Sequence, residues 1–165
     1  MSSVEISRLH KHHHDDYDEA KAQIAQAVGS LADIEVFGRQ IIVGAYVRPN
    51  KTAGGFYIPI SAQKEDIWQG KAVLVLRVGP DAFTGNDDYV RAVFGPKGAP
   101  VPGDWVFLRS DSGLQVSLCG DGAERVKGKD HRGEPIDLYD WDGWPCRIVA
   151  DDSIIGRINK PHTVV

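Results

Sequence analysis

Four histidines and two aspartates near the N-terminus are the densest group of side chains that could do chemistry. The group consists of His10, His12, His13, His14, Asp15 and Asp16. Imidazole and carboxylate groups together can chelate a transition metal. Metal centres, however, hold their ligands on a fixed scaffold, and residues 1–16 are polar without a regular pattern. We therefore interpret this stretch as a solvated tail, and we expect no metal and no cofactor.

The sequence carries none of the familiar catalytic motifs. It contains no Gly-x-Ser-x-Gly elbow, no phosphate-cradling Gly-Lys-Ser/Thr loop and no His-Glu-x-x-His pair. Outside the tail only His131 and His162 could act as imidazole bases, and neither lies near a recognisable nucleophile in the sequence. We expect a protein that is not an enzyme, and we assign no catalytic residue.

An apolar triplet between two expected strands is the best candidate for a binding function. Residues 40–47 and 72–78 are rich in β-branched and aromatic residues, which favour strands. Between them, glycines and prolines interrupt regular structure, so we expect a long loop that exposes Phe56, Tyr57 and Ile58. The alternative is a β-hairpin turn whose triplet folds onto its own sheet.

Five short motifs in a fixed order resemble one known family. They are Thr52-Ala53-Gly54-Gly55 followed by the triplet and Pro59, then Gly70-Lys71-Ala72-Val73, Val78-Gly79-Pro80, Val101-Pro102-Gly103-Asp104-Trp105-Val106 and Ala150-Asp151-Asp152-Ser153-Ile154-Ile155-Gly156. In this order and spacing the chain resembles the GroES-like co-chaperonins, the small chaperonins. The agreement is closest over residues 37–79.

The resemblance implies a fold, a partner and a binding segment. The fold would be all-β, built as a partly open GroES-like β-barrel whose 79–102 excursion forms an enlarged roof. One N-terminal helix, which the resemblance does not supply, completes the expected fold. The protein would assemble into a homo-oligomeric ring of about seven subunits and cap a large chaperonin during protein folding. The docking loop of the family matches Gly54, Gly55, Phe56, Tyr57, Ile58 and Pro59.

A helix outside this resemblance precedes the expected barrel. Tyr17, Ile24, Val28 and Leu31 recur at helical spacing and form one apolar stripe. The stripe requires a surface to pack on, which could be its own barrel, a sister subunit or a foreign partner. We divide the chain into a tail with this helix (residues 1–33), the barrel (34–158, with an insertion at 119–145) and a C-terminal tail (159–165).

Within the barrel we expect three further pairings. Residues 89–94 belong to a hairpin-like excursion, and residues 104–109 pair with 114–118 around a turn of Ser, Asp and Gly. The strand near 37–43 is an open edge that pairs with residues 154–158 of a neighbouring subunit. Aromatic residues of the insertion cap the barrel or fill an interface.

Composition limits the remaining possibilities. The chain has 165 residues and a formal net charge of −4, which provides no general attraction to nucleic acid or anionic membranes. We expect a cytoplasmic protein whose Cys119 and Cys146 are free thiols. A second function fits the same barrel, because folds host many functions: a structural or accessory protein of a bacteriophage particle, such as a capsid, decoration or neck component of the virion.

Overall fold

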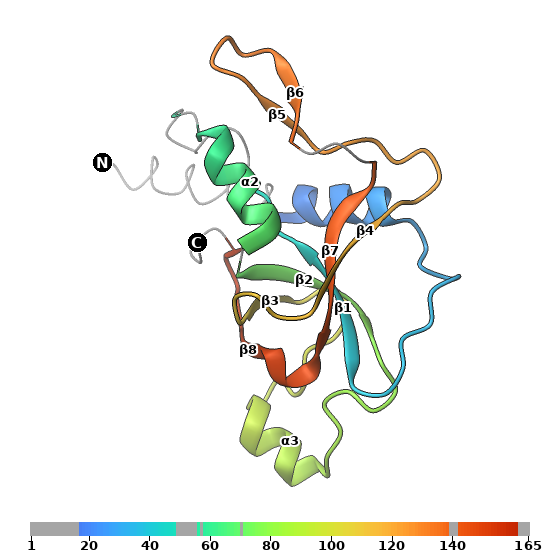
Figure 1. The fold of residues 1–165 in the computed structure, drawn as a ribbon. Helices are drawn as coiled ribbons and strands as arrows, with labels where there is room; N and C mark the ends of the chain where they lie inside the picture. The colour runs from blue at the N-terminus through green and yellow to red at the C-terminus, as the bar shows by residue number, and fades with distance from the viewer. Residues whose placement is uncertain (1–16, 49–55, 57, 70, 139–141, 162–165) are drawn as a thin grey trace.

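A six-stranded antiparallel sheet forms the centre of the computed structural model, which describes residues 17–48, 56, 58–69, 71–138 and 142–161 (Figure 1). Its strands lie in the order β4-β7-β1-β2-β3-β8. Their bounds are β1 Gln40–Ala45, β2 Ala72–Val78, β3 Trp105–Leu108, β4 Leu114–Leu118, β7 Trp144–Ala150 and β8 Ile154–Arg157. The expectation of a β-rich antiparallel fold is confirmed. The sheet does not close into a barrel, since β4 and β8 remain at its two edges.

Both faces of the sheet are apolar. Side chains of successive strand residues point to opposite faces, and β2 accordingly contributes Ala72 and Leu74 to one buried cluster and Val73 and Val75 to another. One cluster contains Tyr46, Trp105 and Trp144, and the other contains Val43 and Val149. Burial on both faces explains why β1 and β2 read in the sequence as nearly continuous apolar runs.

The helix over residues 17–28 covers the first of these faces. Ile24 is fully buried there, and Val28 packs in the same cluster. The carbonyl of Ala27 accepts a 2.7 Å hydrogen bond from the amide of Gly120, which follows β4. The N-terminal helix is therefore part of the same core as the sheet.

The connection between β1 and β2 differs from the long loop that the sequence predicted. Its second half is helix α2 (Ile60–Gln69). Pro59 precedes this helix, and its carbonyl accepts hydrogen bonds from the amides of Ala62 and Gln63. Proline interrupts a helix interior but is tolerated at a helix start, where its missing N–H would have no partner. The proline that suggested a break is thus the start of a helix.

A third helix replaces the hairpin-like excursion expected at residues 89–94. Helix α3 covers Asp87–Phe94, and the side chain of Asn86 caps it by accepting a 2.8 Å hydrogen bond from the amide of Tyr89. Asp87 and Asp88 add negative charge in the first turn, where the helix dipole favours it. These capping residues outweighed the strand-like composition of the segment. The expectation of a single helix was wrong.

Two expected pairings are also corrected. Strand β3 does not pair with β4, because β2 and β8 occupy its two sides, while β4 pairs with β7. Strand β1 is not an edge, since it lies between β7 and β2. The turn composition at residues 110–113 predicted the turn after β3 correctly, but it could not identify the partner of β4, which comes from about thirty residues later.

The inserted residues 119–145 contain a small separate sheet. Strands β5 (Lys127–Lys129) and β6 (Pro135–Asp137) form a two-stranded hairpin. In Figure 1 this hairpin and α3 lie at opposite ends of the molecule, with the six-stranded sheet between them. Residues 139–141, which include Tyr139 and Trp141, lie outside the described residues.

Candidate functional site

The predicted docking segment lies between β1 and α2, and the structure describes part of it. Phe56 is 76% exposed, Ile58 is half-buried and Pro59 is exposed. Gly54, Gly55 and Tyr57 lie outside the described residues. Phe56 is therefore the member of the triplet whose side chain the structure places at the surface, four residues before the first residue of α2.

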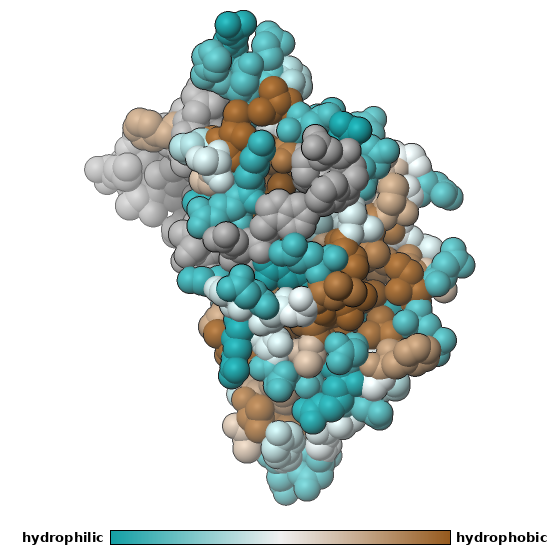
Figure 2. All heavy atoms as spheres, viewed as in Figure 1, coloured by the Kyte–Doolittle hydropathy of each residue, from teal (hydrophilic) through white to brown (hydrophobic). Residues whose placement is uncertain are grey.

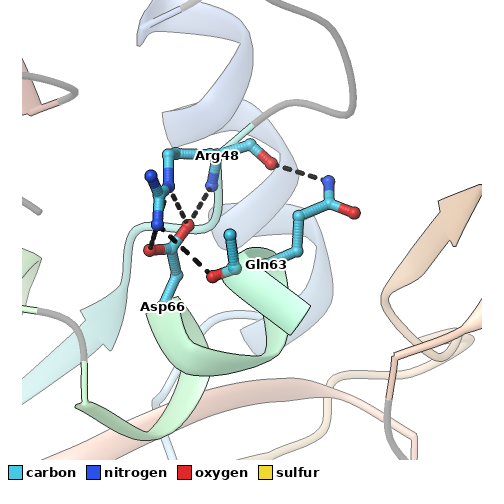
Figure 3. A network of polar contacts seen from close by, with 4 residues as sticks. Arg48, Gln63 and Asp66 are labelled. Carbon is cyan, nitrogen blue, oxygen red and sulfur yellow. Dashed lines mark hydrogen bonds and ion pairs between the residues drawn. The ribbon is translucent and has the colours of Figure 1, made fainter. Parts of the chain in front are cut away.

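A partly buried polar network joins Arg48, shortly after β1, to helix α2 (Figure 3). Arg48 is the last described residue before the gap at 49–55. Its guanidinium donates from Nε to Asp66 Oδ2 at 2.8 Å and from Nη2 to Oδ1 at 2.9 Å. Its backbone amide donates to Asp66 Oδ2 at 3.0 Å, and its carbonyl accepts from Gln63 Nε2 at 2.9 Å. Two side chains of α2 thus hold both the backbone and the side chain of Arg48.

The local sequence explains this arrangement. Gln63 and Asp66 are three residues apart on α2, so they lie on one face of the helix. Both are buried, with exposures of 2% and 6%. The hydrogen bonds to Asp66 are the main cause that raises the pKa of Arg48, so the guanidinium stays charged. A bidentate pair between arginine and carboxylate has a well-defined geometry, and the network therefore fixes where the connection leaves and re-enters the fold.

Sequence reasoning missed all three members of this network. The sequence analysis assigns no role to Arg48, and it predicts a loop where the helix that carries Gln63 and Asp66 lies. A signal was present, because residues 61–66 (Ser-Ala-Gln-Lys-Glu-Asp) contain helix-favouring residues directly after Pro59. Only the spatial pairing of Arg48 with Asp66 could not be read from the sequence.

The second predicted set packs within the protein itself. Tyr17, Ile24 and Val28 are buried, and Leu31 is partly buried against the same cluster. Of the three surfaces left open by the sequence, the chain's own sheet is the one that this stripe contacts. Ile24, Val28 and Leu31 pack there with residues of β2, β3 and β7.

A cavity of about 810 Å³ lies beside the network. Its lining combines the helix at 17–28 with Arg48 and Gln63 and the chain at residues 122–129. Polar residues of both charge signs line it, including Glu19, Glu124 and Arg125. The inserted residues therefore form one wall of a groove whose other walls are the N-terminal helix and the base of the docking segment.

Other potential chemistry is limited in the described part of the chain. No group of three His, Cys, Asp or Glu side chains there could hold a metal ion, and the histidine-rich tail lies outside it. Cys119 is exposed and Cys146 is buried, and both are free thiols, as expected from the sequence. Burial raises the pKa of Cys146 to about 12. Among the described helices, none has the length and apolar character needed to cross a bilayer.

Comparison with known proteins assigns no family to the chain. No model of a known protein family matches the chain. No curated protein sequence matches it either. A functional conclusion therefore rests on the sequence motifs and on the arrangement around Arg48 and Asp66.

Proposed function

We propose that this protein is a GroES-like co-chaperonin that caps a large chaperonin and binds it through residues 54–59. The observation that carries the proposal is the closed base of this segment, in which Asp66 and Gln63 of α2 hold Arg48, three residues after the end of β1. The apolar side chain of Phe56, four residues before α2, is 76% exposed. An exposed aromatic side chain on a fixed base suits insertion into an apolar groove of a partner.

The arrangement of the sheet is compatible with a ring. Edge strands present unpaired backbone groups that another chain can pair with, and the two edges here, β4 and β8, are different surfaces. Pairing of β4 in one copy with β8 in the next is a head-to-tail contact, which generates a ring when the rotation closes. Both edges carry an exposed apolar side chain, Leu114 at 63% and Ile155 at 53%. Figure 2 shows apolar surface on the side where β4 and β7 lie.

A bacteriophage structural or accessory protein is the second candidate. The inserted hairpin β5–β6 and helix α3 lie outside the motifs that resemble the co-chaperonins, and they project at opposite ends of the sheet (Figure 1). Such additions suit fixed contacts in an assembled particle. The co-chaperonin is the preferred function, because the exposed Phe56 next to Gly54 and Gly55 has a specific use there.

A pull-down against a bacterial large chaperonin, with and without ATP, tests the preferred function. We expect nucleotide-dependent binding that is lost in Phe56→Ala. Phe37→Ala is the matched control, because Phe37 is a phenylalanine of similar exposure, 71%, that precedes β1 and lies outside the docking segment. Truncating an exposed anchor should weaken binding about 10-fold or more.

Two outcomes would reject the co-chaperonin function. One is no chaperonin binding by the wild-type protein under either condition. The other is equal binding by the wild type and Phe56→Ala, which would place any contact elsewhere. Stoichiometric recovery of the protein in purified bacteriophage particles, together with absent chaperonin binding, would support the second candidate.

A further inference from the structure

An apolar cluster joins the inserted hairpin to α2. Ile67 of α2 is 2% exposed and Leu138, directly after β6, is 3% exposed, and these two side chains form the centre of the cluster. Ile60 and Val126 pack against them. Leu138 is also fixed by its amide, which donates a 2.9 Å hydrogen bond to the carbonyl of Val126. The chain at the base of the hairpin therefore packs apolar side chains against α2, the helix that follows the docking segment.

A close backbone approach connects the same hairpin to the polar network. A Cβ atom on Gly128 of β5 would lie 2.7 Å from Leu138 Cδ2 and 3.1 Å from Gln63 Oε1. Gln63 in turn donates from Nε2 to the carbonyl of Arg48 at 2.9 Å. Contacts thus run from β5, through Gln63, to Arg48, three residues after the end of β1. Glycine at position 128 permits this approach, because any side chain would push the hairpin away from α2.

The hairpin also has polar contacts of its own. The Nζ of Lys127 pairs with the carboxylate of Asp137 across the two strands, and Arg125 Nη1 contacts the same carboxylate at 3.2 Å. At the turn, Asp130 Oδ1 accepts hydrogen bonds from the amides of Arg132 and Glu134. A two-stranded hairpin is only marginally stable alone. Its contact with α2 therefore stabilises the hairpin and the helix together.

We propose that the inserted hairpin is a positioning element for the docking segment, with Leu138 and Gly128 as its positioning residues. By covering α2, the hairpin holds Gln63 and Asp66 against Arg48 and so keeps the two ends of the segment in the arrangement that the partner binds. Pre-organisation of this kind raises affinity by reducing the conformational entropy lost on binding. This inference rests on the proposed chaperonin-docking function. It gives a role in that function to the inserted hairpin, which the family resemblance does not cover.

Leu138→Ala is the variant that tests the proposal, with Leu108→Ala as its matched control. Leu108 is equally buried, at 1% exposure, but packs in the cluster on the sheet and not against α2. Hydrogen exchange of the free protein, followed by mass spectrometry, measures local opening of α2. We expect Leu138→Ala to accelerate exchange in residues 60–69 and 126–138 selectively. Leu108→Ala should accelerate exchange across the sheet strands, and Leu138→Met should restore slow exchange in α2.

The second readout is the affinity for chaperonin in the presence of ATP. We expect Leu138→Ala to weaken binding about 5-fold or more through reduced pre-organisation, although Leu138 lies outside residues 54–59. Leu108→Ala should bind like the wild type as long as it is folded. Circular dichroism at the working temperature confirms the fold of each variant.

The two readouts separate failure of this inference from failure of the proposed function. Unchanged exchange of α2 in Leu138→Ala would overturn the positioning role, whatever the protein binds. Faster exchange with wild-type affinity would overturn it as well, because the hairpin would then support only the fold. If the wild-type protein does not bind chaperonin at all, the proposed function fails, whereas the exchange data still decide whether the hairpin holds α2.

Discussion

Arg48 and Asp66 form a bidentate ion pair that closes the connection between β1 and β2. The pair joins the guanidinium to both carboxylate oxygens, at 2.8 Å and 2.9 Å for the two closest contacts, and the same carboxylate accepts the backbone amide of Arg48. The side chain of Asp66 is 8% exposed and that of Arg48 is 23% exposed. One acidic residue therefore satisfies three donors at the base of the proposed docking segment.

Asp66→Ala should lower the free energy of unfolding by about 1–3 kcal/mol, because it leaves a partly buried guanidinium and a backbone amide without their acceptor. Urea denaturation followed by circular dichroism measures the loss. The double variant Arg48→Met, Asp66→Leu is the control, since replacing both partners by apolar residues removes the unpaired charge. It should recover part of the stability. A loss below about 1 kcal/mol for Asp66→Ala would contradict a structural role for the pair.

A second buried acid should control stability at low pH. Asp151 lies in the short 3-10 helix Asp151–Ser153 and is 5% exposed. Burial acts to raise its pKa, but hydrogen bonds from the amide of Phe83 and from Arg39 act in the other direction, and the pKa lies below its ordinary value of 3.8. The unfolded chain therefore binds the proton more readily than the folded protein. The stabilisation from this group is complete above the unfolded-state pKa and is lost as the pH falls through the lower, folded-state pKa.

We expect Asp151→Asn to flatten the acid part of the stability profile. The free energy of unfolding of the wild type should fall steeply below about pH 4, and this fall should be shallower in the variant, which carries no titrating carboxyl there. Urea denaturation at several pH values between neutral and acidic conditions measures both profiles. Asp152→Asn removes the neighbouring exposed carboxyl and should leave the profile close to that of the wild type. Parallel profiles for the wild type and Asp151→Asn would refute the assignment.

Charges on either sheet edge should prevent the proposed ring. Leu114→Glu on β4 and Ile155→Glu on β8 each add a carboxylate at an exposed position, so the stability of the monomer should change by less than about 0.5 kcal/mol. In the proposed pairing, each variant would place an unpaired charge within an apolar contact. Native mass spectrometry should show a closed ring for the wild type and mainly monomer for each variant. A wild-type protein that stays monomeric at micromolar concentration would remove the ring from the proposed function.

Local sequence patterns were sufficient for three elements. The helical spacing of Tyr17, Ile24 and Val28 predicted the N-terminal helix. The β-branched composition of two apolar runs predicted β1 and β2, which are buried on both faces and so show no alternation. Local signals were misjudged at two places. Pro59 was interpreted as a break and Asn86 was overlooked as a cap, although both residues mark helix starts.

The tertiary structure decided which segments meet. The sequence by itself determined a β-rich protein with an apolar triplet between two strands, since amphipathic patterns and turn residues act over a few positions. It did not determine that β4 pairs with β7, that β1 is central, or that Asp66 binds Arg48. Each of these contacts joins residues that are distant along the chain. The stability of each contact depends on which other segments compete for the same partner in the folded core. A pattern of neighbouring residues carries no information about those distant segments.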